Sequence, residues 1–187
     1  MNKFIWEKQN ALDSEFCRNT IYRFERDIRK AKGRTIGGHD DNVKKSHDIA
    51  ISRLPGWEKE DRVFYESLNK GLSEYKQYLL ENVYLDIEWD MHDTGYQIQR
   101  TIGGDGFYSW HHDYTEDENG KRKITFIWYL NTVNGPGGET EFIDGTKIKP
   151  EEGKLIFFPS TWDFMHQGVM PPKGVIKYLC TGWLYSA

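Results

Sequence analysis

The chain has 187 residues, the size of one domain, and is long enough to bury a hydrophobic core without disulfide bonds. With 37% hydrophobic and 29% charged residues it resembles a soluble globular protein, and its net charge of −4 gives no support for nucleic-acid binding. No apolar run is long enough to cross a membrane, and the two cysteines, Cys17 and Cys180, fit a reducing, cytoplasmic setting.

The first 83 residues show helical periodicity. A cap at Asp13 or Ser14 predicts the start of a first helix, and a basic last turn before Gly33 predicts its end. A second helix is expected from about Lys59 to Glu81, where hydrophobic residues recur on one side. Residues 1–83 are therefore expected to form a helical support region.

From residue 84 onward the pattern becomes that of β-strands. Short segments rich in aromatic and β-branched residues alternate with glycine, proline and Asn-Gly turns. The expected strands are 84–89, 96–101, 107–111, 123–130, 139–143, 154–158, 164–169 and 175–184. About eight strands at this spacing predict a sandwich or a jelly roll. The expected form is the jelly roll, or double-stranded β-helix, with the helices packed on its larger sheet. We expect a mainly β, α+β fold with one domain over residues 1–187 and a jelly-roll core at 84–187.

The run Trp110-His111-His112-Asp113 contains candidate metal ligands. Residues i and i+2 of a strand share a face, so His111 and Asp113 should project together and His112 away from them. His166, in a later predicted strand, is the best third ligand. Two histidines and one carboxylate form the ligand set of non-haem Fe(II) oxygenases, whereas a His-x-Asp pair alone also occurs by chance.

Lys177 lies within the apolar, strand-like run 175–184. A buried ammonium group is costly unless it is paired with an anion. One interpretation places Lys177 at a sheet edge, facing solvent. The other points it inward, where a bound dicarboxylate supplies the partner that the nearby sequence lacks.

Five sequence blocks occur in the order found in a known family. They are 104–113, 128–131, 137–142, 150–158 and the run from His166 to Trp183. Together they resemble the 2-oxoglutarate- and Fe(II)-dependent dioxygenase superfamily, in its prolyl 4-hydroxylase-like branch. The resemblance covers about half of the chain, from residue 96 to residue 184.

This resemblance implies roles for individual side chains in cofactor binding. The implied Fe(II) ligands are His111, Asp113 and His166. The implied 2-oxoglutarate ligands are Lys177, Tyr129 and Thr181. O2 is the implied third reactant, and ascorbate is the reductant associated with this class.

The substrate pocket is expected to have aromatic walls, for which Tyr108 and Trp183 are the preferred residues. Arg122 resembles a substrate-contacting arginine of some prolyl hydroxylases. The polar segment 114–121 is either a lid or a hairpin loop.

The implied activity is hydroxylation of an unactivated C–H bond, with peptidyl proline as the favoured substrate and with release of succinate and CO2. A free amino acid or small metabolite is an alternative substrate. A non-catalytic, metal-binding jelly-roll module is an alternative of another class. Nucleic acid and membrane are not expected as partners.

Overall fold

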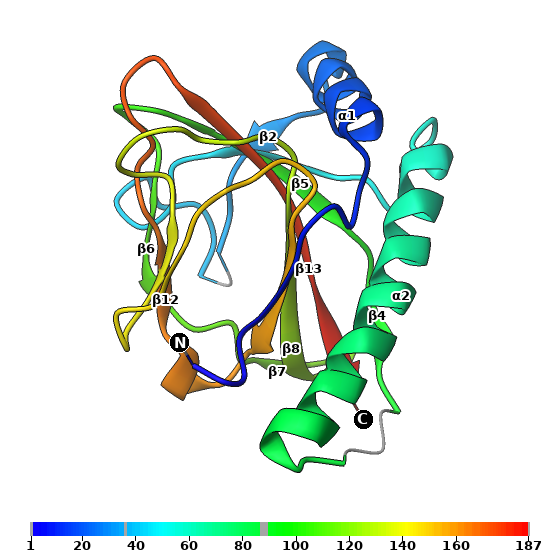
Figure 1. The fold of residues 1–187 in the computed structure, drawn as a ribbon. Helices are drawn as coiled ribbons and strands as arrows, with labels where there is room; N and C mark the ends of the chain where they lie inside the picture. The colour runs from blue at the N-terminus through cyan, green and yellow to red at the C-terminus, as the bar shows by residue number, and fades with distance from the viewer. Residues whose placement is uncertain (1, 36, 87–89, 187) are drawn as a thin grey trace.

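The structure is a computed structural model that describes residues 2–35, 37–86 and 90–186. Two β-sheets face each other, and the long helices lie on the outside of the larger sheet (Figure 1). The elements in chain order are β1 (Trp6–Lys8), α1 (Ser14–Arg26), β2 (Ala31–Lys32), β3 (His47–Ala50), α2 (Glu58–Val83), β4 (His92–Asp93), β5 (Gln97–Ile102), β6 (Tyr108–His111), β7 (Glu116–Asp117), β8 (Gly120–Tyr129), β9 (Thr140–Phe142), β10 (Lys147–Ile148), β11 (Leu155–Pro159), the short 3-10 helix Trp162–Phe164, β12 (His166–Gly168) and β13 (Ile176–Ser186).

The larger sheet has nine strands in the order β1-β11-β8-β13-β5-β3-β2, with β4 paired to β13 and β7 to β8. The smaller sheet has the order β10-β9-β12-β6. Neighbours in both sheets run antiparallel. This arrangement confirms the predicted mainly β jelly roll with helices on the larger sheet.

Polar caps define the first helix. The Asp13 carboxylate accepts the Phe16 N–H at 2.7 Å, which satisfies a donor at the N-terminus of α1. The Lys30 ammonium donates to the carbonyl oxygens of Phe24, Glu25 and Asp27 at 2.7, 2.9 and 2.5 Å. Because these bonds satisfy carbonyls at the end of the helix, α1 ends at Arg26, earlier than the expected end before Gly33.

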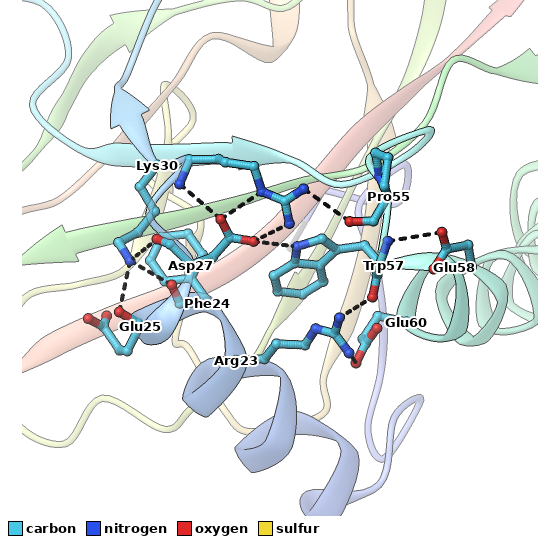
Figure 2. Close-up of polar contacts among 11 residues, drawn as sticks. Arg23, Phe24, Glu25, Asp27, Lys30, Pro55, Trp57, Glu58 and Glu60 are labelled. Atoms are coloured by element: carbon cyan, nitrogen blue, oxygen red, sulfur yellow. Dashed lines mark hydrogen bonds and ion pairs between the residues drawn. The ribbon is translucent and has the colours of Figure 1, made fainter.

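A polar junction joins α1 to the start of α2 (Figure 2). Asp27 accepts a hydrogen bond from Trp57 Nε1 at 2.8 Å and pairs with Arg29 at 2.6 Å. Arg23 lies over the Trp57 ring, 5.0 Å from its centroid, and contacts Glu60 at 3.2 Å. These contacts join the C-terminal end of α1 to the N-terminal end of α2.

Residues 1–83 are not the purely helical support region that we expected. This part of the chain also supplies β1, β2 and β3, which lie at the two edges of the larger sheet. Strands of two to four residues are too short for an alternating pattern to be recognised. The strand expected at 84–89 does not form over residues 84–86. Tyr84 caps the C-terminus of α2 there, with φ 56°. Residues 87–89 lie outside the described part of the chain.

Each face of the larger sheet has its own core. The outer face packs Phe126, Trp128 and Phe157 against Phe64 and Tyr75 of α2. The inner face packs a second apolar cluster against the smaller sheet: Ile127, Tyr129, Phe142, Ile156, Phe158 and Leu179 are among its members. Beyond this cluster the inward positions become polar, and the space between the sheets opens into the candidate site.

None of the helices in residues 2–35, 37–86 and 90–186 has the length and apolar character needed to cross a membrane.

Candidate active site

The predicted triad comes together between the sheets. His111 ends β6, His166 begins β12, and the two are direct cross-strand partners. Asp113 follows β6, with its carboxylate oxygens 3.7 Å from His111 Nε2 and 3.6 Å from His166 Nε2. Candidate ligand atoms from all three residues lie within 4.8 Å of one another. His112 is exposed and points away from them, as the strand alternation predicted.

Hydrogen bonds orient each member of the triad. His111 Nδ1 lies 2.8 Å from the Ser109 carbonyl, and His166 Nδ1 lies 3.0 Å from the Phe164 carbonyl. A carbonyl only accepts, so both Nδ1 atoms donate, which leaves Nε2 as the nitrogen that each ring can offer to a metal. Thr125 donates to Asp113 Oδ2 at 2.8 Å.

The electrostatics of the triad suit a divalent cation. Burial, and then the neighbouring His166, lower the pKa of His111 to about 4, so its imidazole is neutral at neutral pH. Burial raises the pKa of Asp113, but the two histidines and Thr125 lower it, and the net direction is downward. Two imidazoles and one carboxylate, without a thiolate, fit Fe(II). The described thiols, Cys17 and Cys180, are buried elsewhere, in the outer core.

A cavity of about 60 Å³ touches all three triad residues and extends to Lys177. Lys177 is 2% exposed, so its side chain points inward and the interpretation that placed it in solvent is wrong. Its Nζ donates to the Gly138 carbonyl at 2.9 Å, and no carboxylate forms an ion pair with it in the described chain. Burial lowers the pKa of Lys177 to about 8, which is the condition of an ammonium group without an anionic partner.

The other predicted 2-oxoglutarate ligands occupy different positions. Thr181 lines the cavity, although its hydroxyl donates to the Phe126 carbonyl at 2.8 Å. Tyr129 is fully buried in the inner core and is not among the described residues that line the cavity. Its hydroxyl shares a 2.7 Å hydrogen bond with Thr140, which does line the cavity. Tyr129 therefore reaches the cavity wall through Thr140.

A wider cavity of about 510 Å³ opens beside the triad, and Tyr108, Arg122 and Trp183 all line it. The Arg122 guanidinium lies 3.8 Å from the centroid of the Trp183 ring, and its Nε donates to the Tyr185 hydroxyl at 2.6 Å. The first half of the chain supplies part of the wall: Arg34, Val43, Lys44, Ala50 and Ser52. Segment 114–121 is a hairpin, because β7 pairs with the start of β8.

Sequence reasoning missed three buried polar residues that contribute to the candidate site: Thr125, Thr140 and Lys44. Each is at most 3% exposed. Thr125 lies on the same face of β8 as Ile127 and Tyr129, so strand alternation could have marked it as an inward polar residue. No comparable pattern marked Lys44, which lies outside any strand of the larger sheet.

Comparisons with known proteins agree with this geometry. Residues 96–185 match the sequence profile of the 2OG-Fe(II) oxygenase superfamily. A PKHD-type hydroxylase of Synechococcus sp. (strain CC9902) is 33% identical over 93 residues, which make up 48% of this chain. The match spans only 40% of that hydroxylase.

Solved structures share the fold over nearly the whole chain. A viral collagen prolyl hydroxylase from Paramecium bursaria Chlorella virus-1 superposes with a TM-score of 0.71 at 20% identity, covering 100% of this chain and 97% of the viral one. A Pseudomonas putida prolyl-4-hydroxylase gives 0.69 at 19% identity, covering 98% and 93% of the two chains. A prolyl hydroxylase from Trichoplax adhaerens, bound to a hypoxia inducible factor peptide, gives 0.74 at 15% identity, covering 98% and 84%.

The matched region 96–185 contains the triad, Lys177 and the threonines of the smaller cavity. It is also built into a fold that prolyl hydroxylases share. Through this region, the chain is similar to the 2OG-Fe(II) oxygenase superfamily, and its fold is the one that solved prolyl hydroxylases have.

Proposed function

We propose that this protein is an Fe(II)- and 2-oxoglutarate-dependent dioxygenase that hydroxylates an unactivated C–H bond of peptidyl proline. The reaction consumes O2 and releases succinate and CO2. The observation that carries the proposal is the cavity that connects the His111, Asp113 and His166 triad to the buried ammonium of Lys177. In this cavity one carboxylate of a dicarboxylate would pair with the Lys177 ammonium, and the other end would reach a metal held by the triad.

Each group has a role in this proposal. His111, Asp113 and His166 would hold the metal, which supplies open positions for 2-oxoglutarate and O2 when bound. Lys177 binds the distal carboxylate as an ammonium donor. Thr140, supported by Tyr129, and Thr181 form the polar walls of the same cavity and orient the co-substrate.

The wider cavity supports a peptide substrate. Its volume of about 510 Å³ falls in the range of ligand pockets, and it opens beside the metal ligands. Arg122 and Trp183 stack on one another and form a rigid wall, while Tyr108 flanks His111. These aromatic groups hold a target carbon near the triad and exclude water from it. The bound peptide of the Trichoplax adhaerens enzyme is consistent with such a substrate.

Turnover with defined substrates tests the proposal. The protein is incubated with Fe(II), 2-oxoglutarate and proline-containing peptides, and in parallel with free proline, lysine and arginine. We expect succinate and a peptide product heavier by one oxygen atom. Chelation of the metal or Asp113→Ala should abolish both, whereas Asp144→Ala, in the turn between β9 and β10, should leave both unchanged.

Turnover that survives Asp113→Ala would refute the metal site. Turnover of free amino acids alone would refute the peptide substrate but not the enzyme class.

A further inference from the structure

The segment that leads into β3 carries three buried polar side chains. Lys44, Ser46 and Asp48 are 3%, 8% and 5% exposed, and they alternate with residues that are less buried. This alternation places all three on one side of an extended backbone. A buried strand face is normally apolar, and departures from that rule concentrate at functional sites.

The three side chains satisfy one another. Lys44 Nζ pairs with Asp48 Oδ2 at 2.7 Å, with both side chains only 4% exposed. Ser46 donates to Asp48 Oδ1 at 2.8 Å, so both carboxylate oxygens are occupied. Gly33 leaves room for this network, because a Cβ there would lie 2.2 Å from Ser46 Oγ and 3.1 Å from the Lys44 side chain.

The same segment is attached to β6, the edge strand of the smaller sheet. Lys45 donates its N–H to the Phe107 carbonyl at 2.9 Å, and Ser109 donates to the Val43 carbonyl at 2.8 Å. Lys44 and Tyr108 are therefore bridge partners across this pairing. The network lies directly beside the strand that carries His111.

Lys44 connects the network to the metal ligands through an aromatic ring. Its Nζ lies 5.3 Å from the centroid of the Tyr108 ring, within the range of a cation–π contact. The Tyr108 ring stacks on the His111 imidazole with centroids 3.5 Å apart and an interplanar angle of 13°. Contacts thus run from Asp48 through Lys44 and Tyr108 to His111.

We propose that Lys44, held by Asp48, is a positioning residue of the metal centre: it fixes the Tyr108 ring against His111 and so sets the orientation of this ligand. The inference builds on the proposed function, but it concerns the geometry of the ligand set. If the Lys44–Asp48 ion pair were purely structural, uncharged side chains could replace it without a loss of stability or of metal affinity. A loss of metal affinity therefore distinguishes a positioning role from a structural one.

The test uses the double variant Lys44→Met with Asp48→Asn, which removes both charges together and leaves no unpaired buried ion. Co(II) serves as the probe, because its affinity and absorption spectrum report on the ligands without turnover. We expect about tenfold weaker Co(II) binding and a changed Co(II) spectrum, in line with other residues that orient metal ligands. Asp41→Asn is the matched control, since Asp41 pairs with Lys32 in the same segment at 3.2 Å but is 47% exposed.

A second pair of variants tests the same contacts without touching the ion pair. Tyr108→Leu removes the ring and should weaken Co(II) binding to the same extent, whereas Tyr108→Phe keeps the ring and should restore it. Co(II) affinity and spectra within twofold of the unmodified protein in both the double variant and Tyr108→Leu would overturn the inference. If the variants behave as expected but the unmodified protein shows no 2-oxoglutarate turnover, the proposed function fails and the positioning role stands.

Discussion

At the scale of single residues, the site depends on polar side chains that strands carry into a desolvated space. Lys177 comes from β13, Thr125 from β8 and His166 from β12. Each alternates with residues that face the opposite side of its sheet. Burial makes each of them sensitive to its partner, because an uncompensated polar group in such a space costs free energy.

The Lys177 ammonium predicts a pH dependence of 2-oxoglutarate binding. Its pKa in the free protein is lowered to about 8, and a bound carboxylate stabilises the charged form. Affinity should therefore be constant below pH 8 and fall by up to about tenfold per pH unit above it. The affinity for 2-oxoglutarate is measured by calorimetric titration of the Mn(II)-loaded protein from pH 6.5 to pH 9.5. This range brackets the Lys177 pKa of about 8.

The control for this prediction is Lys177→Arg, because a guanidinium stays charged throughout the range. Its affinity should not show the loss above pH 8. An affinity of the unmodified protein that stays flat up to pH 9.5 would contradict the assignment of Lys177 as the carboxylate ligand.

Thr125 predicts an effect on metal affinity. Thr125→Val keeps the shape of the side chain but removes the hydrogen bond to Asp113 Oδ2, which orients the carboxylate. We expect about tenfold weaker Mn(II) binding, measured by titration of the protein without its co-substrate. Thr20→Val is the matched control, since Thr20 is fully buried on α1 and its hydroxyl has no partner in the described chain. Equal affinities of the two variants would count against the role of Thr125.

At the scale of elements, the Asp27 carboxylate is at the centre of the junction between α1 and α2 (Figure 2). Hydrogen bonds from Arg29, and then from Trp57, hold the pKa of Asp27 well below its ordinary value, although burial opposes them. The Asp27 side chain is 9% exposed and Arg29 is 40% exposed, so solvent screens part of this interaction. The junction matters for the site because both helices cover the sheet that carries Lys177.

Asp27→Asn should lower the free energy of unfolding by about 1 to 2 kcal/mol at pH 7. A carboxylate with a depressed pKa contributes stability above its unfolded pKa of about 3.9, and this contribution is lost as pH falls further. The difference in free energy of unfolding between the unmodified protein and Asp27→Asn, measured in urea, should therefore become smaller below about pH 4. Asp41→Asn, at an exposed ion pair, should leave the urea midpoint unchanged. A difference that is independent of pH would rule out the ionised Asp27 as its source.

At the scale of the whole molecule, the two halves of the chain share one core. Phe24, Trp57 and Phe64 from the first half pack against Phe126 and Trp128 from the second. β1 and β3 complete the larger sheet, and residues 34–52 supply part of the wide cavity. We therefore expect the matched region 96–185 to fold only together with the first half of the chain.

A fragment of residues 90–187 should consequently fail to fold alone, because it exposes the outer face of the larger sheet and unpaired strand edges. We expect aggregation, or urea unfolding without a cooperative transition, followed by circular dichroism. Adding a fragment of residues 1–89 should restore cooperative unfolding. A fragment 90–187 that unfolds cooperatively by itself would show that the second half is an independent domain.

The sequence by itself determined the features that depend on local order. Alternation placed His111 and Asp113 on one side of a strand, and the spacing of short aromatic segments predicted most strands from residue 96 onward. The residues also offered His166 as the third candidate ligand, and the resemblance added the expected role of Lys177. These inferences were possible because a side chain's face is set by its position within a single strand.

Only the tertiary structure decided which residues become partners across strands. It placed Thr140 between Tyr129 and the cavity, added three strands of the larger sheet to the expected helical support region, and joined Lys44 and Asp48 to Tyr108. Partners of this kind depend on strand register and on the pairing of distant segments. Neither can be derived from periodicity in one segment, because a shift of one residue reverses the face of every side chain.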